Sequence, residues 1–399
     1  MTRHCGPGYA QCIATEGVGW DKRGASQHLR NRVGVRVAHP DLRWWGTRLV
    51  AACLVMLPSG CASIEYYLQA MGGQLEVWQR ASAIDGVIGD ADTAPALREK
   101  LRRVLAIREF ASRELRLPDN ASYRRYADLG RPYVVWNVFA APEFSLEPVQ
   151  WCFPIAGCVG YRGYFAEADA GRFAAHLAAE GRDVFVNGVP AYSTLGWFAD
   201  PVLNTFVHFP ELQVARLIFH ELAHQVVYVR DDTMFNESFA VAVEREGLRR
   251  WIARHGTEAD RNLFRLMTER RTGFLRLIES YRERLDALYR SPLSPQSMRE
   301  QKARVFAEME ADYRRLRTEW GDFGGYDRWF AQNPNNAHLV SVAIYTQMVP
   351  AFEALLKREG GDLGKFYDTV RELAARPRAE REAQLKSLSS PQARARALL

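Results

Sequence analysis

The sequence lacks several features that would mark a specialised class of protein. Its 399 residues contain no internal repeat and no low-complexity tract, which excludes a repeat architecture and a long biased segment. It has six cysteines, and after residue 61 only Cys152 and Cys158 remain, so no second pair could close a cysteine-ligated zinc site. The composition, 47% hydrophobic and 25% charged, is that of a globular protein with a sizeable core.

The body of the chain also lacks a strong charge of either sign. The formal net charge is +6, but residues 1–60 hold eight basic and three acidic side chains and so account for +5. About +1 remains for residues 61–399, which is too little to attract a polyanion. We therefore expect no nucleic-acid partner.

The basic N-terminal segment is typical of a targeting leader. Arg43 and Arg48 precede the apolar run Leu49–Leu57, which fits a signal h-region and is too short to span a membrane. The residues that follow, Pro-Ser-Gly-Cys61, resemble a bacterial lipoprotein signal, although Pro58 stands where such signals usually have leucine. This resemblance implies that Cys61 is lipidated and becomes the mature N-terminus. The alternative is an N-terminal core helix that ends at Gly60.

The leader also sets the expected domain organisation and location. We predict residues 1–60 as the leader and residues 61–399 as a single unit. Residues 1–33 exceed a normal n-region, which favours a start near Val33 or Val35. The lipid anchor would place the protein in the bacterial cell envelope, facing the periplasm, and Ala62 after the cysteine favours the outer membrane.

Export makes a disulfide between the last two cysteines a reasonable expectation. Cys152 and Cys158 lie in Trp-Cys-Phe-Pro-Ile-Ala-Gly-Cys, whose spacer contains glycine and proline. Two buried thiols are the alternative interpretation.

Hydrophobic periodicity predicts a mainly helical α+β protein with a small sheet in its first half. Short β-prone runs occur at residues 133–139 and 183–186, and Gly86–Thr93 is predicted as a turn. Residues 257–318 are predicted as a long antiparallel helical hairpin, broken at Ser291–Pro295. The other expected helices are Ile64–Ala83, Pro95–Leu115, Glu167–Glu180, Glu211–Tyr228, Phe235–Arg250, Asn336–Lys357 and Leu363–Ala374, followed by a basic, polar tail.

The residues that indicate chemistry lie in His220-Glu221-Leu-Ala-His224. On a helix, positions i and i+4 share a face one turn apart, so both imidazoles can reach one metal ion. Glu221 is then placed to act as a general base on a metal-bound water without binding the metal itself. By itself, the pattern also fits two histidines that pack on a core helix.

A second apolar helix supplies the missing ligand. It begins near Phe235, after the polar, turn-like segment 230–233, so the two helices can fold back on each other. Glu237, thirteen residues after His224, can then complete a His₂Glu set with one open coordination position, which is what catalytic zinc requires. The sequence therefore predicts a zinc-dependent hydrolase with a zincin-like fold.

These motifs resemble known families of peptidases. His-Glu-Leu-Ala-His-Gln followed by Asn-Glu-Ser-Phe-Ala resembles the metal helices of aminopeptidase N-like gluzincins, with a shorter connecting loop and no Gly-Ala-Met-Glu-Asn strand. The chain also resembles a family of predicted, lipoprotein-like bacterial aminopeptidases over nearly all of residues 61–399. The other shared segments are Gly72–Leu75, Gly157–Phe165, Ala191–Trp197 and Asn335–Leu339 with Tyr345. The resemblance implies a zinc peptidase that acts on peptides, and it identifies the reaction class better than the substrate.

Further residues are candidates for substrate binding. Zinc peptidases of this type use a tyrosine or histidine to donate to the oxyanion, which makes Tyr345 a candidate, with His338 as the alternative. A core tyrosine is the competing interpretation. Residues 189–197 are expected either as an edge strand that pairs with a peptide or as an aromatic-rich loop.

An aminopeptidase also needs a carboxylate to bind the substrate ammonium, and Glu143, Glu147 and Glu167 are the candidates. Two other functions remain open at this stage. One is an envelope endopeptidase, and the other is a non-catalytic lipoprotein scaffold that uses the hairpin as its partner surface. The scaffold has no need of a base such as Glu221.

Overall fold

The computed structural model describes residues 11–12, 58–153 and 157–389. The chain divides into two compact units, Thr15–Glu76 and Val77–Leu399, the second together with Met1–Ala14. The described part of the first unit belongs to helix α2 (Pro58–Arg80), which continues into the second. Most of the predicted leader lies outside the described residues, so its boundary at residue 60 stays a prediction.

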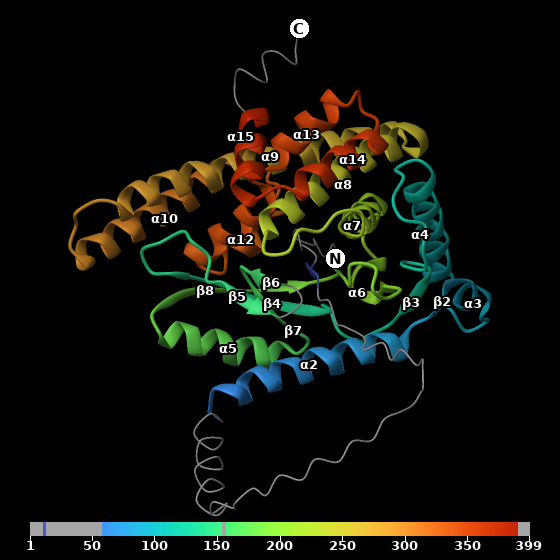
Figure 1. The fold of residues 1–399 in the computed structure, drawn as a ribbon, viewed down its shortest axis with the longest axis horizontal. Coiled ribbons are helices and arrows are strands. Elements are labelled where there is room, and N and C mark those ends of the chain that lie inside the picture. Colours follow the sequence, from blue (N-terminus) through green and yellow to red (C-terminus); the bar gives the residue numbers. More distant parts are fainter. Residues whose placement is uncertain (1–10, 13–57, 154–156, 390–399) are drawn as a thin grey trace, which may run out of the picture. The chain divides into compact units, whose positions relative to one another are not determined.

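A three-stranded antiparallel sheet, in the order β7-β4-β8, supports the site (Figure 1). Its strands are β4 (Val135–Pro142), β7 (Arg162–Tyr164) and β8 (Arg182–Val189). Helix α5 (Glu167–Ala179) packs on one face and helix α12 (Asn336–Thr346) on the other.

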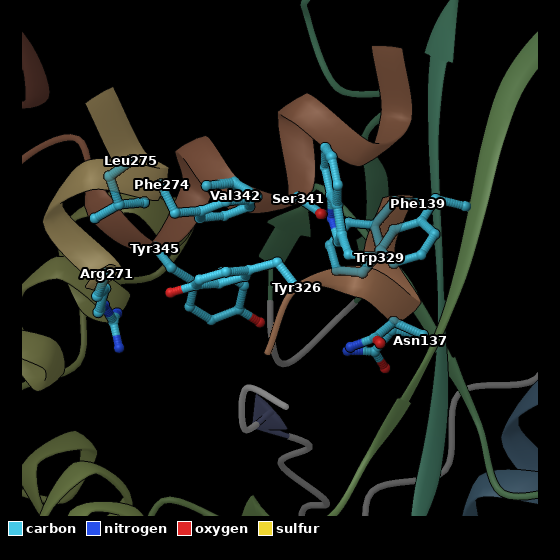
Figure 2. Close-up of a pocket in the computed structure, with 12 residues that line it drawn as sticks. Asn137, Phe139, Arg271, Phe274, Leu275, Tyr326, Trp329, Ser341, Val342 and Tyr345 are labelled. Carbon is cyan, nitrogen blue, oxygen red and sulfur yellow. The ribbon is translucent and has the colours of Figure 1, made fainter. Parts of the chain in front are cut away.

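The register of this sheet lines up two pairs of side chains on the face toward α12. Asn137 lies opposite Asn187, and Phe139 lies opposite Phe185. Because alternate residues of a strand point to the same face, all four side chains share one side. They border a pocket that Tyr345 of α12 also lines (Figure 2).

The remaining strands are short. One sheet has the order β10 (Val202–Leu203), β3 (Arg125–Ala127), β2 (Ser82–Ala83). Strands β5 (Trp151–Phe153) and β6 (Gly157–Val159) pair antiparallel, with Cys152 opposite Cys158, and a disulfide joins the two cysteines. Strand β9 (Tyr192–Ser193) pairs in parallel with β1 (Gln11–Cys12).

The largest hydrophobic core lies among the helices that carry the metal-binding motifs. In it Phe239 of α8 packs against Phe352 and Phe366, and Phe110 of α4 packs against Trp251. The contributing helices are α3 (Ile84–Gly89), α4 (Pro95–Arg113), α6 (Asn204–Val207), α7 (Glu211–His224), α8 (Thr233–His255), α13 (Val349–Arg358), α14 (Leu363–Ala374) and α15 (Arg378–Ser389).

The predicted hairpin is formed by α9 (Glu258–Tyr289) and α10 (Pro295–Glu319). A capping box at Thr257 begins α9, and the side chain of Ser294 caps α10, whose first residue is a proline. A second hydrophobic cluster joins the hairpin to α11 (Asp327–Phe330). The fold is therefore α+β and mainly helical, with its strands in the first half of the chain, as predicted.

Several predicted boundaries are wrong. The predicted turn at Gly86–Thr93 is in part helix α3, and residues 82–83 leave the first helix to form β2. The predicted helix 336–357 is two helices, α12 and α13, because Pro350 has no N–H to continue the first one. Residues 378–389 of the predicted tail form helix α15, whose Arg381 is buried against Asp232.

The stretch Asn336–Arg358 is long and apolar enough to cross a membrane by length and composition. In the structure it comprises the core helices α12 and α13, and most of it is buried inside the protein.

Candidate metal centre

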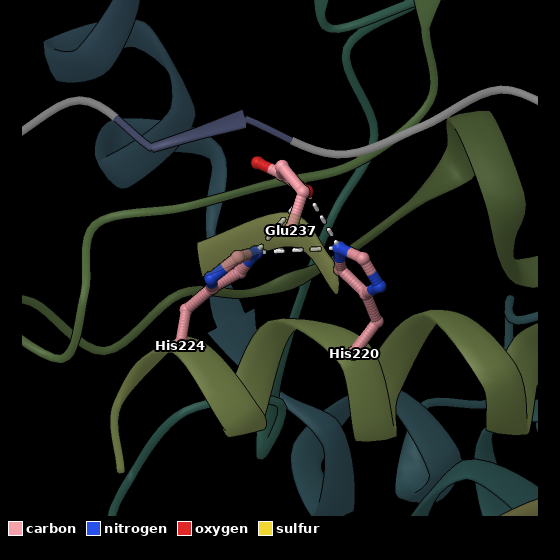
Figure 3. A group of neighbouring side chains, drawn as sticks. All are labelled: His220, His224 and Glu237. Carbon is pink, nitrogen blue, oxygen red and sulfur yellow. Dashed lines mark hydrogen bonds and ion pairs between the residues drawn. The ribbon is translucent and has the colours of Figure 1, made fainter. Parts of the chain in front are cut away.

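Helices α7 and α8 bring three predicted ligands to one point (Figure 3). The Nε2 atoms of His220 and His224 are 3.2 Å apart, and Oε2 of Glu237 lies 3.2 Å from the first and 3.6 Å from the second. All three side chains are buried. These three atoms form a triangle, called the ligand triangle below. The sequence spacing of the two histidines sets the distance between their Nε2 atoms, and the packing of α8 on α7 sets the two distances to Glu237.

The triangle has the size that a zinc ion needs. Three ligand atoms at about 2.0–2.1 Å from one ion, at tetrahedral angles, lie about 3.3–3.4 Å from one another. Two imidazole nitrogens and a carboxylate oxygen are also Lewis bases, which repel one another unless a proton or a cation lies between them. The three residues could therefore hold a metal ion.

A fourth buried residue fixes the orientation of His220. The Nδ1–H of this histidine donates to Oε2 of Glu244 at 3.0 Å, which leaves its Nε2 facing the other ligands. Arg216 and Arg271 lie 3.7 Å and 3.6 Å from the other oxygen of Glu244. Burial raises the pKa of Glu244, but Arg216, His220 and Arg271 outweigh it and lower the pKa to about 2. Glu244 is therefore ionised at neutral pH and can only accept hydrogen bonds.

The pKa values of the ligands reflect the same coupling. Burial lowers the pKa of His220, and the hydrogen bonds to Glu237 and Glu244 outweigh this effect and raise the pKa to about 10. The pKa of His224 is lowered, chiefly by burial. Burial raises the pKa of Glu237, but the nearby histidines outweigh it and lower the pKa. The cluster therefore favours a positive charge at its centre.

Glu221 is buried but is not part of the ligand triangle. Neither of its carboxylate oxygens accepts a hydrogen bond from any residue that the structure describes. Burial raises its pKa well above the ordinary value, so it is poised to hold a proton. A buried carboxyl group without a partner suits a group that exchanges a proton with a bound molecule.

The loop between α7 and α8 is closed by its own hydrogen bonds. The side chain of Asn236 accepts from the N–H of Val229 and donates to the carbonyl oxygen of the same residue, both at 2.7 Å. Asp232 caps α8 by accepting from the N–H of Phe235, and its other oxygen pairs with Arg381 of α15. These contacts fix the first turn of α8, and with it Glu237.

Helix α7 ends at His224 rather than at the predicted Tyr228, and the side chain of the next residue contacts a different segment. The side chain of Gln225 accepts from Asn120 at 2.7 Å and donates to Ser122 at 3.3 Å. A side chain at Gly196 would approach Gln225 to 3.3 Å, so the segment around Gly196 also lies against the end of α7.

The predicted segment 189–197 is part strand and part loop. Tyr192 and Ser193 form β9, which packs near α7, but both residues are buried and β9 pairs with β1, so the strand is not the exposed edge that was expected. Thr194 donates to Asp200 from its N–H at 3.0 Å and from its hydroxyl at 2.7 Å. Burial outweighs these hydrogen bonds and raises the pKa of Asp200 to about 7.

The other candidates lie elsewhere. Tyr345 is buried on α12 and lines the pocket, together with Arg271. His338 stacks on Phe185 and is bonded to Asn335. Burial lowers the pKa of His338 to about 3.

None of the three glutamates expected to bind an ammonium group lines this pocket. Glu143 pairs with Arg299, which holds the pKa of Glu143 below its usual range. Glu147 and Glu167 are exposed. Cys61 falls in the first turn of α2, and its side chain lies outside what the structure describes.

Sequence reasoning missed Glu244, although a signal was present. Glu244 follows Glu237 by seven residues, or about two helical turns, so the two side chains share a helix face. The residues directly before Glu244, 239–243, are all apolar. Arg216, Arg271 and Asp200 carry no such signal, because each meets its partner only through the tertiary fold.

Comparison with known proteins gives one match. The model of the family described as "Putative aminopeptidase" matches residues 65–385, a stretch that includes α7, α8 and the pocket. No curated protein and no solved structure matches the chain.

Proposed function

We propose, from the premise that the chain belongs to the "Putative aminopeptidase" family, that it is a zinc-dependent peptidase that acts as an aminopeptidase. One observation carries the proposal. Three buried ligand atoms converge to within 4.8 Å, and a fourth buried carboxyl group, that of Glu221, comes one residue after the first ligand. A structural zinc site would close the fourth position with another ligand, typically a cysteine.

His220, His224 and Glu237 would hold the ion. Bound zinc supplies Lewis acidity, which polarises the scissile carbonyl and makes a water molecule more acidic. Glu221 takes a proton from the attacking water and passes it to the leaving amine. Glu244 holds the imidazole of His220 in the tautomer that presents Nε2.

The peptide would lie along β9. This strand packs near α7 and pairs in parallel with the extended segment β1, and a peptide would take the place of β1 by strand addition. Tyr345 remains the proposed donor to the oxyanion. Replacement of Tyr345 by phenylalanine should lower kcat with little change in zinc content, and an unchanged kcat would remove it from the mechanism.

The test combines zinc analysis with paired peptide substrates. Purified protein should contain about one zinc per chain and hydrolyse peptides with a free N-terminus in preference to the same peptides after N-acetylation. Equal cleavage of both forms would indicate the endopeptidase instead. Zinc without any hydrolysis, across a broad peptide set, would support the non-catalytic scaffold.

We also propose that the protein is a lipoprotein of the bacterial envelope, anchored through Cys61 and facing the periplasm, with the outer membrane favoured. In a Gram-negative host the full chain should incorporate labelled fatty acid, and Cys61→Ser should abolish the incorporation. Cys53→Ser, in the apolar run, is the matched control and should keep the label. Label that persists in Cys61→Ser would contradict the proposed anchor.

A further inference from the structure

Half of the residues that line the pocket beside the sheet are aromatic. Phe139 and Phe185 come from the strands, Phe274 from α9, and Tyr326 and Trp329 from the segment around α11. Phe274 stacks on Tyr326 with ring centroids 4.0 Å apart, and Trp329 meets Phe274 edge to face at 5.5 Å. The rings hold one another in place, so this part of the wall is pre-formed for an apolar group.

The wall of the pocket also contains polar groups. Asn137 and Asn187 are cross-strand neighbours, and Arg271 approaches from α9. In Figure 2 the side chains of Arg271 and Asn137 lie below the rings of Phe274 and Trp329. The side-chain oxygen of Asn137 is buried and accepts no hydrogen bond from any residue that the structure describes. It is therefore available to accept a hydrogen bond from a ligand, such as a peptide N–H.

Arg271, one of the polar residues of the wall, adjoins the metal centre. Arg271 lies 3.6 Å from Glu244, and Glu244 accepts from His220 at 3.0 Å. Helix α12, which contributes Ser341 and Tyr345 to the pocket, packs against α8, which carries Glu237. Arg271 on the wall of the pocket and the predicted metal ligand His220 therefore contact the same residue, Glu244.

We propose that this pocket binds a large apolar side chain, aromatic or branched aliphatic, of the substrate residue next to the scissile bond, with that residue's main chain against Asn137 and Asn187. The inference rests on the proposed function and names the substrate class of the same site. The aromatic rings bury the side chain, and the two amides complement the N–H and C=O of the peptide.

The charge of the wall further restricts the ligand. Over the described residues, no aspartate or glutamate lines the pocket, whereas Arg271 supplies a positive charge. A substrate ammonium or a lysine side chain would be desolvated here beside a like charge. The pocket thus excludes cationic residues, and the free amine of the substrate lies outside it.

The first experiment changes the space in the pocket. Each position of a short free-amine peptide is varied among Ala, Leu, Phe and Lys, and kcat/KM is measured for the full-length protein. One position next to the cleaved bond should prefer Leu and Phe to Ala by about tenfold or more, and Lys should be the poorest. Leu275→Trp, at the half-buried rim, should lower kcat/KM for the Phe peptide by a much larger factor than for the Ala peptide. Leu263→Trp, exposed on the same helix, is the matched control and should behave as wild type.

The second experiment changes the charge. Asn187→Asp places a carboxylate on the polar wall, so the ratio of kcat/KM for the Lys peptide to that for the Leu peptide should rise by about tenfold. Thermal melting of each variant identifies one that has failed to fold. A wild type without any apolar preference, or a Leu275→Trp variant that slows all peptides equally, would overturn the proposed pocket.

A binding measurement separates this inference from the proposed function. Calorimetry on the full-length Glu221→Gln variant compares the free-amine peptides Ala-Phe-Ala-amide, Phe-Ala-Ala-amide and Ala-Ala-Ala-amide. Tighter binding of either Phe peptide, abolished by Leu275→Trp, supports the pocket even if no hydrolysis is ever observed. Equal binding of all three peptides by a protein that hydrolyses peptides would overturn the pocket and leave the peptidase in place.

Discussion

His220 donates from Nδ1 to Glu244, and the two residues come from different helices that pack directly against each other. The carboxylate of Glu244 is kept ionised by Arg216 and Arg271, so it accepts from the imidazole over a wide range of pH. Nε2 of His220 faces Glu237 and His224, and once its proton is displaced it can offer its lone pair to a metal ion. Glu244 of α8 thus sets the orientation of the predicted ligand His220, through the ring nitrogen that does not face the other ligands.

Glu244→Ala should weaken zinc binding by roughly 10- to 100-fold, because the Nδ1–H of His220 loses its acceptor. Glu244→Gln keeps an acceptor oxygen and should weaken binding less. The measurement is zinc competition against a chelator of known affinity. Glu246→Gln, on the same helix but bonded to Arg249 and Arg250, is the matched control. Equal affinities in Glu244→Ala and the control would mean that Glu244 does not orient the ligand.

Glu221→Gln should lose activity and keep zinc, whereas Glu237→Ala should lose zinc. Glu221→Gln keeps the shape of the side chain but cannot accept a proton, so kcat should fall by roughly 10²- to 10⁴-fold while zinc stays near stoichiometric. Glu237→Ala removes a ligand, so its zinc content should fall. Zinc analysis beside peptide kinetics tests both. If Glu221→Gln loses zinc as well, the carboxyl group binds the metal and is not the base.

Asp200 should make the stability of the protein depend on pH between about 4 and 7. Its pKa is raised by burial to about 7 in the folded protein, from an ordinary value of 3.8. The folded state therefore keeps a proton that the unfolded chain releases in this range, and stability falls as the pH rises through it. Three pKa units correspond to about 4 kcal/mol as an upper limit.

Asp200→Asn cannot titrate, so its free energy of unfolding should fall less steeply over the same range. Urea unfolding of both proteins at half-unit steps of pH gives the two profiles. Parallel profiles would show that Asp200 is ionised throughout.

Gly247→Val should destabilise the packing of α8 on α7. An added Cβ at Gly247 would lie 2.7 Å from the ring of Phe219 and 2.8 Å from Leu115, so the helices must separate. Overpacking of this kind costs about 1–3 kcal/mol, measured by urea unfolding, and it should also weaken zinc binding, since Phe219 precedes a ligand. Gly171→Ala is the control on α5, where an added Cβ meets nothing within 4 Å. A neutral Gly247→Val would indicate that the two helices can shift without loss.

The parts of the site that could be predicted are those set by local geometry. His220 and His224 share a helix face by spacing alone, and Glu237 required only that two helices joined by a short polar loop fold back on each other. Helix α14 matches its predicted bounds, because its apolar face and the capping Asp362 are both visible in the sequence.

The rest depends on contacts between distant segments. At the end of α7, Gln225 is bonded to Asn120 and Ser122, which lie more than a hundred residues earlier. The pocket joins strands of the first half of the chain to α9 and α12, and no periodicity predicts that meeting. Only their negative charge made Glu143, Glu147 and Glu167 candidates for binding the ammonium group, and the sequence does not show that Glu143 pairs with Arg299.

The buried pair between Arg381 and Asp232 ties the last helix to the first turn of α8 across 149 residues of sequence. Loss of one partner of such a pair leaves an uncompensated buried charge and costs about 3–5 kcal/mol. A polypeptide that stops before residue 381 would therefore lack the support that fixes the turn next to Glu237. During synthesis, this contact can form only when nearly the whole chain has been made, so we expect the first turn of α8 to reach its final order late.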